Sequence, residues 1–128
     1  MRIDSLDHFV LVVSDIDMAC AFYTRVLGMR QVVFGDNRKA LVFGQQKINL
    51  HQVGRGFEPK AACPAAGSAD ICFLTRTPLA EVAAHFVREG VPVVEGPVRR
   101  TGAQGPIMSL YIRDPDGNLL ELSNPLVG

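Results

Sequence analysis

The sequence lacks an excess of charge of either sign, long apolar runs and a paired set of cysteines. Thirteen basic residues balance thirteen acidic ones, so no long-range attraction to nucleic acid or to an anionic membrane is expected. No apolar stretch approaches the roughly 20 residues that a membrane-spanning helix requires. Residues 1–4 lack the basic and then apolar pattern of a secretory signal. These absences favour a soluble protein that binds small molecules, with no nucleic-acid or membrane partner.

The cysteine content indicates the compartment. Cys20, Cys63 and Cys72 form no CxxC pair and cannot all pair with one another. An odd and scattered set is typical of a reducing environment, so we expect a cytoplasmic protein. Cys20 and Cys72 lie in apolar segments and are expected to be small buried side chains, whereas Cys63 lies in a loop.

The first half of the chain predicts a strand, a helix and three further strands. Residues 6–13 form a β-rich apolar run, and Ser14 with Asp17 three residues later predicts the start of a helix. Apolar residues then recur at helical spacing until Gly28, which predicts the helix end. Short strand-like segments follow at residues 29–34, 39–43 and 47–53.

The same order returns after a segment rich in Gly, Pro and Ala. Thr77 is expected to cap a second helix, with Pro78 as its first residue and Gly90 at its end. Residues 95–105 are expected to form a longer loop, and Gly102–Pro106 within it is expected to be a hairpin loop rather than a lid. The strands of this half are predicted at residues 69–75, 91–94, 107–112 and 118–123.

The two halves are therefore interpreted as a repeat. Gly28 corresponds to Gly90 and His8 to Asp70, an offset of about 62 residues, which grows to about 70 later in the module. A repeat predicts architecture more reliably than a single element does, and here it predicts two βαβββ modules. Each helix would cover one sheet face and leave the other face available. The resulting division is a first module at residues 4–54, a linker at 55–67 and a second module at 68–125.

Four polar residues stand out on the predicted strands. Alternation places His8, His51, Asp70 and Glu121 on the less apolar face of a first or last strand of a module. If the modules fold together, these side chains converge in one concave site, where two imidazoles and two carboxylates suit Zn²⁺, Ni²⁺, Mn²⁺ or Fe²⁺. Each residue alone also fits an ordinary core or surface role. The predicted metal site therefore depends on their convergence.

Three motifs resemble the vicinal oxygen chelate superfamily, which includes glyoxalases, bleomycin resistance proteins and extradiol dioxygenases. They are LDHFVL at residues 6–11, FYTRVLG at 22–28 and DPDGNLLE at 114–121. The resemblance implies one α+β domain over residues 1–128, in which two βαβββ modules form a cupped, incomplete mixed β-barrel with helices outside. Other segments are similar to a glyoxalase-domain subgroup labelled virulence-associated or dioxygenase-related: residues 38–41, 47–51 and 57–60.

The resemblance also implies a cofactor and an assembly. Members of this superfamily hold a divalent metal between two modules, paired within one chain or between two, so a homodimer is expected. His8 and Glu121 match the most regular ligands of the superfamily. His51 stands where a glyoxalase-like enzyme usually has a glutamate, and Asp70 where most metal-binding members have a second histidine.

The superfamily supports three hypotheses about function, because fold alone does not fix the reaction. The first is a divalent-metal-dependent lyase or isomerase, similar to lactoylglutathione lyase, in which Glu121 or Asp70 moves a proton beside a metal-polarised carbonyl. The second is an extradiol Fe(II) dioxygenase, which requires two histidines and one carboxylate and would need His51 to replace a ligand. The third is a metal-free protein that binds a small aromatic or antibiotic molecule. A substrate carboxylate could be held by Arg38, Arg99 and Arg100.

Overall fold

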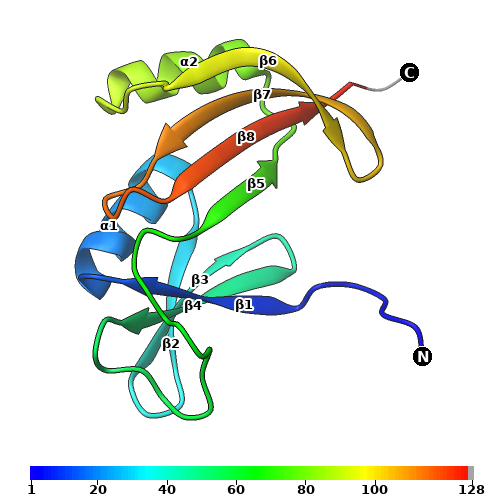
Figure 1. Cartoon of the computed structure of the whole chain (residues 1–128). Helices are drawn as coiled ribbons and strands as arrows, with labels where there is room; N and C mark the ends of the chain where they lie inside the picture. Colours follow the sequence, from blue (N-terminus) through cyan, green and yellow to red (C-terminus); the bar gives the residue numbers. More distant parts are fainter. Residues whose placement is uncertain (127–128) are drawn as a thin grey trace. The chain divides into compact units, whose positions relative to one another are not determined.

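The computed structural model describes residues 1–126 and divides the chain into two compact units, Met1–Gly67 and a second that begins at Ser68. Each unit has the predicted order of strand, helix and three strands (Figure 1). Neither helix is long and apolar enough to cross a membrane, over the residues that are described. The first unit contains β1 (His8–Val13), α1 (Ile16–Leu27), β2 (Arg30–Phe34), β3 (Arg38–Phe43) and β4 (Gln46–Gln52). The second contains β5 (Asp70–Leu74), α2 (Leu79–Arg88), β6 (Glu95–Gly102), β7 (Gly105–Arg113) and β8 (Leu119–Pro125).

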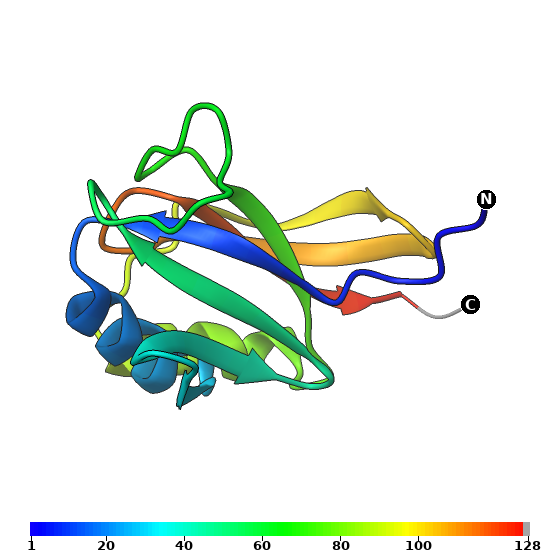
Figure 2. The same ribbon diagram turned by 90° about the horizontal axis from the view of Figure 1, so that it is seen from below.

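Each unit forms a four-stranded mixed sheet that does not close into a barrel. The strand orders are β1-β4-β3-β2 and β5-β8-β7-β6. The first and last strands of each unit are parallel neighbours, and the other pairs are antiparallel. Figure 2 shows β1, in blue, beside β4, in green. This arrangement confirms the predicted α+β class with two βαβββ modules.

The strand register corrects the repeat that the sequence suggested. His8 lies opposite Lys47 on β4, and its counterpart Asp70 lies opposite Leu119 on β8. The offset between the last strands is therefore 119 − 47 = 72 residues, and the expected offset of 70 is wrong. The two offsets differ by two residues, and residues two apart on a strand point to the same face of the sheet. The predicted sheet faces are therefore unchanged.

The core of each unit lies between its helix and one sheet face. In the first unit Leu11, Val13 and Ile48 are buried, as the alternation predicted, while His8 and Val10 on the opposite face are exposed. Each fully buried aliphatic side chain contributes about 1.5–3 kcal/mol, which fixes the face that packs on the helix. The side chains that do not pack on the helix lie on the opposite, more polar face of the sheet. The second unit buries Phe86, Leu110, Ile112, Leu120 and Leu122 in the same way.

Both helix starts differ from the prediction. Asp15, rather than Ser14, caps α1, because its backbone is extended and its side chain accepts a hydrogen bond from the backbone N–H of Met18 at 3.0 Å. Thr77 does not cap α2. The side-chain oxygen of Asn124, on β8, instead accepts from the N–H of Leu79 at 2.8 Å. No local pattern reveals this cap, because the acceptor lies 45 residues away.

The largest error of the sequence prediction concerns β6. Residues 95–102 form a strand rather than a loop, and residues 91–94 form no strand. Gly96 and Pro97 are unusual in strands, so the sequence did not predict β6. An edge strand nevertheless tolerates proline. Glycine is needed at position 96 because a Cβ there would lie only 2.4 Å from the carbonyl oxygen of Ser109. Gly102 pairs with Gly105, so residues 103–104 form a tight two-residue hairpin turn, and the expectation of a long hairpin loop over residues 102–106 is wrong.

The Asn124 cap provides a test of the second unit. Its side-chain amide also donates to the carbonyl oxygens of Thr75 and Thr77, both at 2.9 Å. We expect Asn124→Ala to lower the free energy of unfolding by about 2 kcal/mol, because a cap and two further hydrogen bonds are lost. Urea unfolding followed by circular dichroism measures this. Gln104→Ala, in the exposed hairpin turn, should change stability by less than about 0.5 kcal/mol, and equal midpoints for the two variants would contradict the assignment.

Candidate functional site

The polar face of the second sheet is hollowed by a cavity of about 450 Å³, a volume within the range of small-molecule sites. Strand register explains its lining. Glu95 on β6 lies opposite Tyr111 on β7, and Tyr111 lies opposite Glu121 on β8. Directly opposite residues share a face of the sheet, so side chains from distant segments meet here. The cavity is lined by Asp70, Val94, Glu95, Arg100, Tyr111, Arg113, Leu119 and Glu121.

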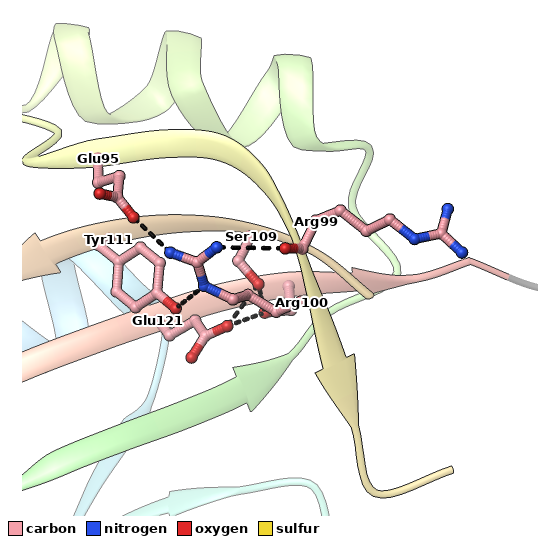
Figure 3. Close-up of polar contacts among 7 residues, drawn as sticks. Glu95, Arg99, Arg100, Ser109, Tyr111 and Glu121 are labelled. Atoms are coloured by element: carbon pink, nitrogen blue, oxygen red, sulfur yellow. Dashed lines mark hydrogen bonds and ion pairs between the residues drawn. The ribbon is translucent and has the colours of Figure 1, made fainter. Parts of the chain in front are cut away.

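Two buried serines hold the carboxylate of Glu121. The hydroxyl of Ser109 donates to Glu121 Oε2 at 2.5 Å, and the hydroxyl of Ser123 lies 3.5 Å from the same oxygen. The serine hydroxyls are 2.7 Å apart, and both residues are fully buried. The other carboxylate oxygen of Glu121 points away from the serines (Figure 3). Glu121 is therefore a rigidly oriented carboxylate with one oxygen left for a ligand.

Arg100 places a cation in the same cavity. Its guanidinium donates to Glu95 Oε2 at 2.5 Å, to the hydroxyl of Tyr111 at 3.0 Å and to the carbonyl oxygen of Arg99 at 3.2 Å (Figure 3). The hydrogen bond with Tyr111, above all, raises the pKa of Arg100. The side chain of Arg99 points away from this cluster, because neighbouring residues on a strand face opposite sides. Of these two predicted substrate-binding arginines, the structure brings only Arg100 into the cavity.

Asp70 lines the cavity beside Glu121. It lies opposite Leu119 on the neighbouring strand, and Cys72 lies opposite Glu121. The two carboxylates are therefore two residues, about 7 Å, apart along the sheet. Cys72 was expected to be buried, but it is exposed, with its sulfur 3.4 Å from the hydroxyl of Ser123. Desolvation raises the pKa of its thiol, so the thiol is neutral at pH 7 and a poor nucleophile.

The two predicted histidine ligands lie at different levels of the first sheet. His8 lies opposite Lys47, and His51 lies opposite Val12, four residues further along β1. This corresponds to about 13 Å along the sheet, and strand side chains stand roughly perpendicular to it. The structure therefore does not bring His8 and His51 to one ion. The His8 side chain is 42% exposed, and its Nδ1 lies 2.7 Å from a carboxylate oxygen of Asp7.

His51 and Asn49 are buried polar residues with unsatisfied atoms. Their exposed fractions are 6% and 5%, and within residues 1–126 neither His51 Nε2 nor Asn49 Oδ1 has a hydrogen-bond partner. Desolvation, followed by the charges of Arg38 and Lys60, lowers the pKa of His51, so its imidazole is neutral at pH 7. Sequence analysis missed Asn49, although the offset of 72 residues makes it the counterpart of Glu121.

The ligand sets of the two units are incomplete when each unit is considered alone. Within residues 1–126, neither unit gathers three or more His, Cys, Asp or Glu side chains that could hold a metal ion. The second unit supplies three carboxylates to one cavity, of which Glu95 pairs with Arg100, and the first supplies His8 and His51 at separate levels. The register therefore rules out one ion shared by all four residues, and the convergence of His8 with Asp70 and Glu121 on a single ion stays a prediction.

Two similar proteins match nearly the whole chain. A virulence protein from Salmonella typhimurium, STM3117, is 59% identical over 123 residues, which are 96% of this chain and 85% of that protein. Its crystal structure superposes with a TM-score of 0.97 at 58% identity, covering 98% of this chain and all of the other. A glyoxalase domain-containing protein from Mycosarcoma maydis, RDO1, is 56% identical over 97% of this chain and 70% of its own length.

More distant structures share the fold alone. A lactoylglutathione lyase from Agrobacterium tumefaciens has a TM-score of 0.74 at 24% identity, covering 97% of this chain and 96% of that one. An antibiotic binding protein from a Streptomyces species, TnmS3, has a TM-score of 0.75 at 23% identity, covering 98% of each chain. The family model described as the Glyoxalase/Bleomycin resistance protein/Dioxygenase superfamily matches residues 5–122, and the chain belongs to this superfamily.

Proposed function

We propose that the protein is a divalent-metal-dependent lyase or isomerase of the glyoxalase type, acting on a small substrate that chelates the metal through oxygen atoms. One observation carries this proposal. Asp70 and Glu121 line a single cavity together with a cation, Arg100, and a phenolic hydroxyl, Tyr111. Such a cavity combines groups that bind a cation with groups that can bind or protonate an anionic substrate.

The donor set of this cavity fits Zn²⁺, Ni²⁺, Mn²⁺ or Fe²⁺. Carboxylate oxygens are ligands for all four ions, and Ser109 orients Glu121 in the way that outer hydrogen bonds orient metal ligands. We assign His8 as a third ligand by resemblance. Its hydrogen bond to Asp7 is of the carboxylate–histidine kind that accompanies metal-bound imidazoles. His51 is left out of this set because of its level on the sheet.

Each polar residue of the cavity has its own role in the proposed reaction. A bound divalent ion supplies Lewis-acid polarisation of paired substrate oxygens. The hydrogen bond from Ser109 fixes the orientation of Glu121, which suits a ligand, whereas the exposed carboxylate of Asp70 suits the transfer of a proton to or from a neighbouring carbon. Arg100 would neutralise negative charge on the substrate, and the hydroxyl of Tyr111 would hydrogen-bond to a substrate oxygen.

An extradiol dioxygenase fits this chain less well. That chemistry uses Fe(II) with two histidines and one carboxylate on adjacent coordination positions. Asp70 occupies the position of the second histidine, and His51 lies about 13 Å along the sheet from the level of His8, so it cannot replace the missing ligand. Oxygen consumption with catechols, which distinguishes the two reactions, should be absent.

A metal-free binding protein is the second candidate. It is favoured by the incomplete ligand set of each unit over residues 1–126 and by the fold shared with an antibiotic binding protein. In that case the cavity would hold a small aromatic or antibiotic molecule by its shape and polar lining. Such a protein would retain its ligand affinity in the double variant His8→Ala/Glu121→Ala, whereas a metal-dependent enzyme would lose its activity.

We also propose that the protein works as a homodimer in the cytoplasm. The dimer is supported by membership of a superfamily whose modules pair within or between chains. The compartment is supported by the three free cysteines, of which Cys20 is buried and Cys63 is exposed.

Metal content tests the main proposal. Wild-type protein loaded with Mn²⁺, Fe²⁺, Ni²⁺ or Zn²⁺ and then dialysed should retain about one ion per chain, by elemental analysis. Glu121→Gln should reduce metal affinity by at least about 100-fold, because a charged ligand is lost where even outer-sphere changes cost 10–100-fold. Isomerisation of the adduct of methylglyoxal with glutathione, or with other thiols, should fall in parallel.

The matched control for this experiment is Glu81→Gln, which removes the same charge from an exposed position on α2. It should leave metal content and activity unchanged. A wild-type protein that retains none of the four ions would refute the proposal and leave the metal-free candidate.

The serines allow a graded test of how Glu121 is positioned. Ser109→Ala removes the 2.5 Å hydrogen bond to Glu121 and should weaken metal binding by about 10-fold or more. Ser123→Ala removes the 3.5 Å contact and should have a smaller effect. Isothermal titration with Mn²⁺ measures both affinities, and thermal unfolding checks that both variants are folded. An unchanged affinity in Ser109→Ala would show that the serine does not position the ligand.

A further inference from the structure

The polar face of the first sheet carries a group of residues that the proposed metal chemistry does not use. Lys47, Asn49 and His51 alternate along β4 and share this face. Ala40 on β3 lies opposite Asn49, so Arg38, two residues earlier on β3, lies on the same face beside His51. Strand pairing thus brings a guanidinium, an amide and an imidazole together.

A loop packs over the end of this group. The ring of Phe57 contacts the ring of His51 edge-on, with 5.5 Å between centroids. A Cβ on Gly56 would lie 3.5 Å from His51 Nδ1 and from the side chain of Lys60. The loop therefore covers His51 and brings a further cation close to it.

The buried atoms of this group point to a missing partner. His51 Nε2 and Asn49 Oδ1 are inaccessible to solvent and lack hydrogen bonds within residues 1–126. Buried polar atoms in native structures are almost always satisfied, and exceptions often mark a site for water, an ion or a ligand. The two residues are about 7 Å apart along β4, so one small molecule can reach both.

The charge of the group identifies the kind of partner. The guanidinium of Arg38 lies between two aromatic rings, 4.9 Å from the centroid of Phe34 and 4.7 Å from that of Phe57. No carboxylate within residues 1–126 pairs with it. The ammonium of Lys47 lies 4.0 Å from the same Phe34 centroid. A guanidinium stacked on rings keeps its N–H edge free to bind an oxyanion through two parallel hydrogen bonds.

We propose that Arg38, His51 and Asn49 form a binding site for a small hydroxylated oxyanion, either a carboxylate or a phosphate. Arg38 binds the oxyanion, the Nε2–H of neutral His51 donates a hydrogen bond to it, and Asn49 Oδ1 accepts from the hydroxyl of the ligand. The lowered pKa of His51 agrees with this arrangement, because its causes include the charges of Arg38 and Lys60. Lys60 and Lys47 add positive charge, which Glu58, 3.6 Å from Lys60, offsets in part.

The imidazole of His51 serves as the reporter for this site. Full-length protein in EDTA, so that no metal-bound anion contributes, is titrated with inorganic phosphate, acetate and glycolate while the ring resonances of His51 are followed by NMR. Binding of an anion should raise the pKa of His51, since a nearby negative charge favours the imidazolium. Glycolate should bind more tightly than acetate, because only glycolate carries a hydroxyl for Asn49, and Asn49→Ala should remove this difference.

Two variants on one strand provide the comparison. Arg38→Gln should weaken binding of phosphate or glycolate by about 10-fold or more, since a charge-assisted hydrogen bond is lost. Lys39→Gln removes the same charge from the adjacent residue, which faces the other side of the sheet and pairs with Asp17, and it should bind like the wild type. Circular dichroism establishes that both variants are folded.

The outcomes separate the two ligand sources from a failure of the proposal. Preferential binding of phosphate or of glycolate identifies the oxyanion that the site selects. Equal affinities for Arg38→Gln and Lys39→Gln, or His51 resonances that none of the three anions moves, would overturn the site. Such a failure would leave the metal proposal intact, because that proposal is judged by the metal content of Glu121→Gln.

Discussion

The parallel pairing of the first and last strands in each unit is the constraint from which the rest of the structure follows. Because a parallel ladder fixes which residues lie level with one another, it decides which side chains can share a ligand. In the second unit it places Asp70 within two residues of the level of Glu121. In the first unit it separates His8 from His51 by four residues. The same topology thus places Asp70 close to Glu121 and keeps His8 away from His51.

The register also shows how two copies of one module have diverged. Asn49 and Glu121 occupy equivalent positions on β4 and β8. Glu121 is a carboxyl group supported by two buried serines, whereas Asn49 is an amide with an unsatisfied oxygen. His51 is correspondingly equivalent to Ser123, one of the supporting serines. The two strands thus differ both at this level and at the position two residues further along.

Much of the fold could be predicted from the sequence because it depends on local patterns. Helical spacing before Gly28, in the left-handed conformation at the end of α1, and alternation along β1 and β8 identified the elements and their buried faces. The cap from Asn124 and the strand β6 could not be predicted, because both depend on partners distant in sequence.

The candidate site was predictable only in part, for the same reason. Alternation alone identified Asp70 and Glu121 as residues of the polar face. Tyr111 and the orienting role of Ser109 emerge only when the β7–β8 register is known. The β1–β4 register shows that His8 and His51 are too far apart on their sheet to act together, which spacing in the sequence cannot reveal.

The polar faces of the two units favour ligands of opposite charge. The face of the second unit presents three carboxylates and two arginines, and Arg100 pairs with Glu95, so the carboxylates outnumber the cations by one. The face of the first unit presents Arg38 without a carboxylate partner among residues 1–126, and burial, followed by the charges of Arg38 and Lys60, lowers the pKa of His51. Coulombic interactions are strongest at short range. A ligand close to these groups therefore responds to their local charge, although the net charge of the whole chain is zero. Duplication of a scaffold that fixes backbone positions thus leaves side-chain charge free to differ between the two polar faces.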